Sequence, residues 1–187
     1  MIRTGLIGGA MALAAAAALT ANAPAQAQTY VEVTGGWTDQ PDLMWNNTDW
    51  EMDRGEHWGA AVGHHIRPNI AIEVEALRTR TNYTGWPNND LTATSLMVNG
   101  VYSFRREGPV RPYVGLGVGG VRVGYSPFDS EDDVFGWQAM AGVEIPIAGQ
   151  VSGFVEYRYQ DAATAEDSGL EWEYLSHNLG LGLRYTF

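Results

Sequence analysis

The chain of 187 residues contains no cysteine and no lysine. Without cysteine it can form neither a disulfide bond nor a thiolate metal site. Because lysine is missing, arginine supplies every fixed positive side-chain charge, and 11 arginines stand against 22 acidic residues. The resulting net charge of −11 at pH 7 argues against a nucleic-acid partner, since binding phosphates requires a basic surface.

Long apolar runs are also missing, apart from one near the N-terminus. Arg3 is followed by an alanine- and leucine-rich stretch from Leu6 to Leu19, and Ala25-Gln26-Ala27 fits the small-x-small cleavage rule. This pattern predicts a signal peptide over residues 1–27 and one mature domain over residues 28–187. An N-terminal membrane anchor is the alternative. No later segment approaches the ~18 apolar residues that a membrane helix needs.

Apolar and polar residues instead alternate with a period of two, which is typical of strands that have one apolar face. In the last such segment Leu179, Leu181 and Leu183 share one face, and the opposite face is glycine, polar or charged. Alternation predicts eight strands, at about 30–37, 57–66, 70–77, 91–104, 114–119, 135–145, 151–160 and 174–187.

The connections between these segments alternate in length. Three are short turns, at 67–69, 105–110 and 146–150, whereas four are longer and polar, at about 38–56, 78–90, 124–133 and 161–173. This alternation predicts an all-β, antiparallel, up-and-down barrel with both termini at the short-turn end.

Two kinds of eight-stranded barrel share this topology, and they differ in which face is apolar. A soluble, lipocalin-like barrel keeps its large apolar side chains inside, whereas a membrane barrel turns them outward. Eight strands enclose too little space for the leucine, valine, tryptophan and tyrosine residues of the apolar face. We therefore expect these residues to face lipid and the barrel to span a membrane.

The charged residues within the strands fall on the opposite, inward register. Unpaired charges in a narrow lumen would be costly, so we expect them to form a network of ion pairs and hydrogen bonds. A sealed polar plug is favoured over a narrow porin-like channel for small solutes. The residues assigned to this interior network are Glu32, Glu73, Glu75, Asn99, Gln138, Glu144, Glu156, Arg158 and Arg184.

Several segments resemble the OmpA-like and OmpX-like family of small outer-membrane β-barrels. These are 181–187 (LGLRYTF), 111–119 (RPYVGLGVG), 62–66 with the turn 67–69, and 155–159 (VEYRY). His64 departs from the family, which usually has tyrosine there. The resemblance implies export through the periplasm to the outer membrane, and a signal for the barrel-assembly machinery at Leu183, Tyr185 and Phe187. No peptidoglycan-binding domain is expected after the barrel.

Other residues suggest contacts at the two membrane surfaces. Arg54, Arg78, Arg80 and Arg122 lie near the outer strand ends, where they could meet lipopolysaccharide phosphates. The acidic run at 129–133 is either a solvated loop or a divalent-cation site. Eight aromatic residues are expected to form interfacial girdles, with Trp37, Trp58, Trp86, Trp137 and Trp172 near the outer strand ends and Tyr113, Tyr185 and Phe187 at the inner end.

Catalytic, cofactor and metal sites are not expected. His64 and His65 are neighbours on a strand and point to opposite faces, and the same geometry separates Ser176 from His177. A lipid A-modifying enzyme is therefore less favoured than a structural or surface-interaction barrel that supports envelope integrity. We expect a monomer whose partners are outer-membrane lipid, lipopolysaccharide and, during biogenesis, the assembly machinery.

Overall fold

The computed structural model describes residues 28–39, 43–45, 48–50, 54–82, 90–125, 130–167 and 170–187. Within these ranges no helix is long and apolar enough to cross a membrane. The ten strands are β1 (Thr29–Asp39), β2 (Leu43–Trp45), β3 (Thr48–Trp50), β4 (Gly55–Arg67), β5 (Ile70–Asn82), β6 (Asp90–Ser103), β7 (Arg111–Tyr125), β8 (Ser130–Ala148), β9 (Val151–Asp167) and β10 (Leu170–Thr186).

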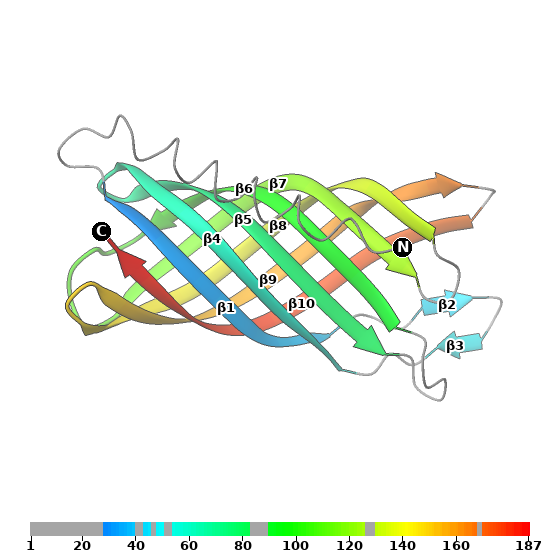
Figure 1. The fold of residues 1–187 in the computed structure, drawn as a ribbon, viewed down its shortest axis with the longest axis horizontal. Coiled ribbons are helices and arrows are strands. Elements are labelled where there is room, and N and C mark those ends of the chain that lie inside the picture. The colour runs from blue at the N-terminus through cyan, green and yellow to red at the C-terminus, as the bar shows by residue number, and fades with distance from the viewer. Residues whose placement is uncertain are drawn as a thin grey trace, which may run out of the picture.

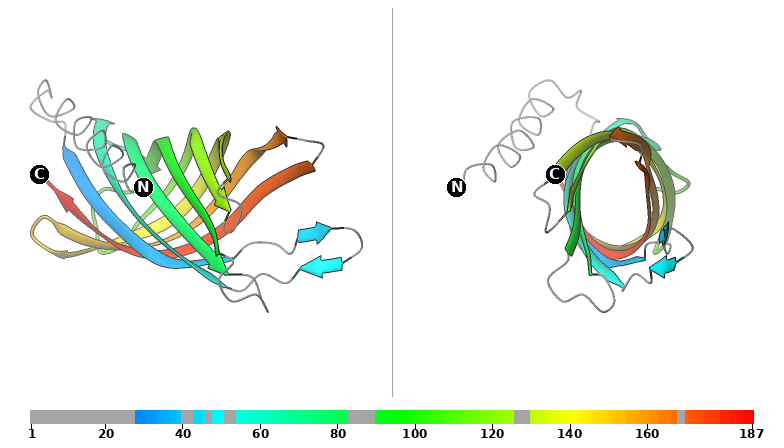
Figure 2. Two further views of the ribbon diagram at one scale, coloured as in Figure 1. Left: turned by 45° about the vertical axis from the view of Figure 1, so that its right-hand side comes forward. Right: turned by 90° about the vertical axis from the view of Figure 1, so that its right-hand side faces the viewer.

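Eight of the strands form a closed antiparallel barrel, which confirms the predicted fold. Each pairs with its neighbour along the chain, and β1 pairs with β10 to close the ring. The end-on view in Figure 2 shows this ring. The other two strands, β2 and β3, form a short hairpin between β1 and β4.

The two ends of the barrel differ in their connections. At one end, which we call the turn end, short segments join β4 to β5, β6 to β7 and β8 to β9. The C-terminus lies at this end, and the β2–β3 hairpin lies at the opposite loop end (Figure 1). The β8–β9 connection is only two residues long, and Gly149 adopts a positive φ of 55° there, a conformation that glycine tolerates without strain.

Strand register fixes the tilt of the barrel wall. Starting from Met97 on β6, we can step from each residue to its paired partner on the next strand until β10 is reached. Stepping through β5, β4 and β1 leads to Arg184, and stepping through β7, β8 and β9 leads to Tyr174. These two residues are ten positions apart, so the barrel has eight strands and a shear number of ten. Strands with this stagger are tilted by roughly 40° from the barrel axis, and the lumen is narrow.

Alternation sorts the side chains between lipid face and lumen as the sequence predicts. Large apolar side chains are exposed on the outer face of every strand of the barrel, and together they form a belt. Representative members are Val33 on β1, Trp58 on β4, Ile72 on β5, Leu96 on β6, Leu116 on β7, Phe135 on β8, Val155 on β9 and Leu181 on β10.

The strands are longer at the loop end than alternation predicted, so part of the expected polar connections was wrong. β5 continues to Asn82, and β8 already begins at Ser130. β9 continues to Asp167, and β10 already begins at Leu170. Beyond the apolar belt, hydrogen-bonded pairing continues in water, where neither face needs to be apolar. Hydrophobic alternation therefore ends before the strand does.

Candidate functional site: a charged lumen

The lumen contains all nine residues assigned to the interior network. Each of them is at most 9% exposed. They are held there by strand parity, because every second residue of each strand points inward. Their side chains form two layers, one near the turn end and one nearer the middle of the barrel.

Arg184 is the centre of the turn-end layer. Its guanidinium pairs with Glu32 on β1 at 2.7 Å and with Glu144 on β8 at 2.6 Å. The other oxygen of Glu144 accepts a hydrogen bond from Arg111 at 3.2 Å. Glu144 therefore bridges a buried arginine and a half-exposed arginine at the mouth of the lumen.

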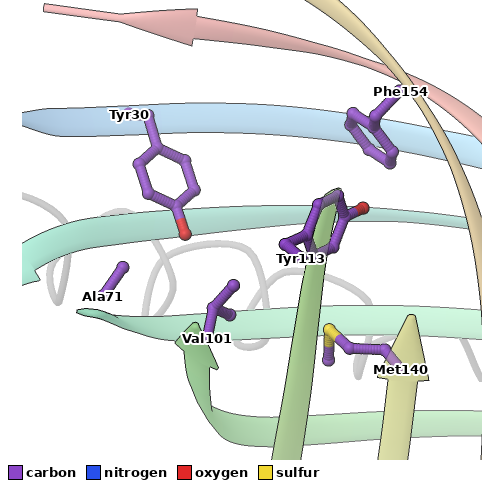
Figure 3. Close-up of a cluster of buried hydrophobic side chains, with 6 residues drawn as sticks. All are labelled: Tyr30, Ala71, Val101, Tyr113, Met140 and Phe154. Atoms are coloured by element: carbon purple, nitrogen blue, oxygen red, sulfur yellow. The ribbon is translucent and has the colours of Figure 1, made fainter. Parts of the chain in front are cut away.

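Arg184 is also surrounded by aromatic rings. Its guanidinium carbon lies 4.3 Å from the centroid of the Tyr30 ring, 5.5 Å from that of Tyr113 and 5.7 Å from that of Phe154. These distances are within the range of cation–π attraction. Figure 3 shows the three rings with Ala71, Val101 and Met140, in a cluster of buried apolar side chains inside the barrel.

Arg158 on β9 is the centre of the central layer. It pairs with Glu75 from β5, on the other side of the lumen, and with Glu156 on its own strand at 2.5 Å. Glu75 also accepts hydrogen bonds from the side-chain amides of Asn99 at 3.0 Å and Gln138 at 2.7 Å. The central layer therefore ties together side chains from β5, β6, β8 and β9.

Two tyrosines connect the layers. The Tyr30 hydroxyl donates to Glu73 at 3.0 Å, and Asn99 donates to the other oxygen of Glu73 at 2.8 Å. The Tyr113 hydroxyl donates to Glu156 at 2.8 Å. Because the rings of both tyrosines also contact the Arg184 guanidinium, these hydrogen bonds and cation–π contacts together link the two layers into one network.

The inward position of Tyr113 contradicts its assignment to an interfacial girdle. Tyr113 shares its parity on β7 with Gly115 and Gly117, which face inward, and this signal could have placed it correctly. Three large aromatic rings, those of Tyr30, Tyr113 and Phe154, are buried in the lumen although eight strands enclose little space. Large rings fit because each lies opposite a glycine on the adjacent strand, namely Tyr30 opposite Gly63, Tyr113 opposite Gly142 and Phe154 opposite Gly182.

Nearer the loop end, two side-chain hydrogen bonds in the lumen join neutral polar groups. The Thr38 hydroxyl donates to Asn178 at 2.6 Å, and the Asn178 amide donates to Ser176 at 3.1 Å. Buried apolar residues cover the other side, and they are Ala93, Met97, Val121 and Ala162. Among the residues that the structure describes, the buried ion pairs lie in the middle and at the turn end.

Among the described lumen residues, acidic groups outnumber basic groups. Five glutamates, Glu32, Glu73, Glu75, Glu144 and Glu156, are buried together with only Arg158 and Arg184. Arg111 adds a third positive charge at the mouth. A cavity of about 810 Å³ opens at this turn end, lined by His65, Arg106, Arg111, Glu144 and Arg184 among others.

The four arginines expected to contact lipopolysaccharide lie at the loop end. Arg78 and Arg80 are exposed on the outer face of β5, and Arg54, just before β4, pairs with Asp39 at 3.4 Å. Arg122 on β7 pairs with Asp133 through two hydrogen bonds of 2.7 and 2.9 Å. Asp133 is therefore a strand residue with an arginine partner, which corrects its placement in a loop, and Asp129 lies outside the described residues.

Of the eight aromatic residues assigned to the interfacial girdles, the five exposed ones that the structure describes face outward, as expected, and Tyr113 does not. Trp37, Trp58 and Trp137 are exposed on the outer wall, whereas Trp86 and Trp172 fall where the structure describes no side chain. At the turn end the Tyr185 and Phe187 rings make an edge-on contact with centroids 5.1 Å apart. Leu183 and Tyr185 project from the outer face of β10, and Phe187, directly after the strand, is also exposed.

The histidines are dispersed. His57 and His65 point into the lumen, where the His65 ring packs on Tyr30, whereas His64 and His177 lie on the outer wall beside Thr29 and Tyr157, respectively. No group of three or more histidine, aspartate or glutamate side chains among the described residues is arranged to hold a metal ion.

A closed eight-stranded barrel with an apolar outer belt and a charged lumen is the architecture of a transmembrane barrel of bacterial outer membranes. Solved structures agree with this class. Neisserial surface protein A is 20% identical, with a TM-score of 0.67 over 85% of this chain and 97% of its own. The N-terminal β-barrel domain of Pseudomonas aeruginosa OprF is 18% identical, with a TM-score of 0.52 over 87% and 100%.

Ail, the attachment invasion locus protein of Yersinia pestis, crystallised with the heparin analogue sucrose octasulfate, is 12% identical, with a TM-score of 0.58 over 86% and 99% of the two chains. These similarities show a shared fold. The family model of the outer membrane protein beta-barrel domain matches residues 11–187, so this chain belongs to that family. Its place is accordingly the bacterial outer membrane. A comparison with curated proteins found no match.

Proposed function

We propose that this chain is a non-catalytic, monomeric barrel that supports the integrity of the outer membrane and presents its acidic loops for surface interactions, with a lumen closed to solutes. One observation carries the closed lumen: Arg158 and Arg184 each pair with two buried glutamates, and the two layers are joined by Tyr30 and Tyr113.

The ion pairs lie across the path that a solute would take. Arg158 reaches from β9 to Glu75 on β5, two strands that are not neighbours in the barrel. A solute passing this layer would have to separate the pair and leave both charges with too few partners in a poorly hydrated space, which is costly. The aromatic rings around Arg184 narrow the lumen further at the turn end.

The purified barrel is accordingly expected to give no resolved single-channel openings in planar bilayers. The matched control is the double variant Glu75→Gln and Arg158→Gln, which removes the charge pair across the lumen and should admit ions if the barrel still folds. Resolved openings of the unaltered protein would contradict the closed lumen and favour a narrow channel. Such openings would be cation-selective, because five glutamates outnumber two arginines among the buried lumen residues.

The signals that we propose for export and for assembly lie in the first 27 and the last five residues of this sequence. We propose that residues 1–27 are removed after Ala27 and that Leu183, Tyr185 and Phe187 are read by the barrel-assembly machinery. Protein extracted from outer membranes should then have the intact mass of Gln28–Phe187. A product that retains Met1 would contradict the cleavage, whereas Phe187→Ser should reduce the yield of assembled barrel without changing the cleavage site.

A further inference from the structure

A shallow apolar groove runs along the outer wall over β6, β7 and β8. Its volume is about 260 Å³, and its outward-facing side chains are Val98, Leu116, Val118 and Trp137. The groove lies within the apolar belt, so its surroundings in the membrane are acyl chains. A groove of this kind offers a lipid acyl chain more contact area than a smooth wall does.

The wall remains open from this groove toward the loop end because of Gly120. Register places Gly120 between Leu96 on β6 and Phe135 on β8, and both of these side chains are exposed. A Cβ added at Gly120 would have no neighbour within 4 Å, so this position is an unfilled gap in the outer surface. We call Val118, Gly120 and the flanking Leu96 and Phe135 the Gly120 strip.

Positive charge lies directly at the loop end of this strip. Arg122 is the next outward residue of β7, roughly 13 Å along the strand from Val118. Register places Thr94 opposite Arg122 on β6, and Arg78 opposite Thr94 on β5. The two arginine backbones are thus roughly 10 Å apart, a separation that two long side chains can bridge around one phosphate group.

Arg122 is held in place from its other side. Asp133 accepts hydrogen bonds from its Nε and Nη2 atoms, and the Arg122 side chain is still 53% exposed. This pairing restricts the side-chain rotamers of Arg122, so less conformational entropy is lost when an anion binds. The carboxylate of Asp133 also repels an anion, and it therefore limits the affinity of the site.

The distribution of arginines makes this part of the outer wall the one that attracts an anion. All four arginines at the loop end lie on or next to β4, β5 and β7, although the chain as a whole carries a net charge of −11. Arg54 is paired with Asp39, and register places Arg80 opposite Glu56. Arg78 and Arg122 are the two arginines of this group that border Thr94 at the end of the Gly120 strip.

We propose that the outer wall formed by β5 to β8 binds one molecule of lipid A, the phosphorylated and acylated anchor of lipopolysaccharide. One acyl chain lies in the Gly120 strip and the groove below it, and one phosphate is bound by Arg78 and Arg122. Guanidinium groups bind phosphate oxygens through paired hydrogen bonds, and the apolar strip fixes which lipid chain accompanies the phosphate.

The test is binding of purified bis-phosphorylated lipid A to the full mature barrel in detergent, measured by native mass spectrometry over a concentration series. Arg78→Ala with Arg122→Ala should weaken binding at least tenfold, and Gly120→Leu should weaken it severalfold by filling the strip. Asp133→Asn should strengthen binding severalfold, because a repelling charge is removed while the side-chain size is kept.

Matched controls separate the site from general effects. Arg105→Ala with Arg106→Ala removes two positive charges at the turn end, and Gly35→Leu adds the same side chain to the opposite outer wall on β1. Neither should change the affinity, and all variants should keep the gel mobility of folded barrel when unboiled. Unchanged binding by the double arginine variant, or by Gly120→Leu, would overturn the site. Equal affinity for dephosphorylated lipid A or for phosphatidylglycerol would overturn lipid A as its occupant.

Discussion

Replacing Arg184 with methionine is expected to destabilise the folded barrel by about 3–5 kcal/mol, the usual cost of removing one partner from a buried ion pair. Methionine fills much of the same volume, so the loss comes from charge. Glu32 loses its arginine partner, and Glu144 keeps only the 3.2 Å contact with Arg111. The measurement is the free energy of unfolding in urea after refolding into phospholipid vesicles.

Two further variants identify the cause of this loss. Arg105→Met removes an exposed arginine from the β6–β7 turn and should change stability by no more than about 0.5 kcal/mol. Adding Glu32→Gln and Glu144→Gln to Arg184→Met should recover part of the loss, because the unpaired buried charges are then gone. An unfolding curve of Arg184→Met that coincides with that of the unaltered protein would show that the turn-end layer contributes little to stability.

The second large effect concerns the outer wall. Leu181→Arg on β10 places a charge in the apolar belt, at a residue that is 57% exposed and lies between Gly35 on β1 and Val155 on β9. In a bilayer this substitution should cost about 2–4 kcal/mol, as arginine does near the midplane of other membrane barrels. Urea unfolding in vesicles measures it.

Val110→Arg is the matched control for this substitution. Val110 is also an exposed apolar residue, but it lies in the β6–β7 turn outside the strands. Arginine there can reach water, so the expected change is within about 0.5 kcal/mol. If Leu181→Arg were as harmless as Val110→Arg, and the protein stayed in solution without detergent, the outer wall would not face lipid.

Much of the barrel could be predicted because one sequence property, alternation, reports the face on which each residue lies. Leu179, Leu181 and Leu183 project outward for the same reason that Arg184 projects inward. The loop-end extensions could not be predicted in this way. Residues such as Asp133 are paired in the parts of the strands that extend beyond the lipid. Both faces of the sheet meet water there, so the sequence does not need to alternate between apolar and polar residues.

From the sequence, the residues of the charged site could be predicted to face inward, but their pairing could not be predicted. Parity assigns Glu32 and Arg184 to the lumen, but the two are 152 positions apart, and only the closed register of β1 with β10 shows that they are partners. The same limit explains the error at Tyr113. Tyrosine is common at membrane surfaces, and its fit inside depends on Gly142, which comes opposite it only through the pairing of β7 with β8.

The ion pair between Glu32 and Arg184 joins the first strand of the barrel to the last. While the sheet is still open, these two charges belong to opposite edges and cannot neutralise each other. Pairing of β1 with β10 is therefore the step at which Glu32 gains its arginine partner. An open intermediate can still form the pairs within β8, β9 and β10, namely Arg184 with Glu144 and Arg158 with Glu156, but it leaves Glu32 unpaired. A chain that cannot pair its two edges should therefore remain incompletely inserted and exposed to periplasmic proteases.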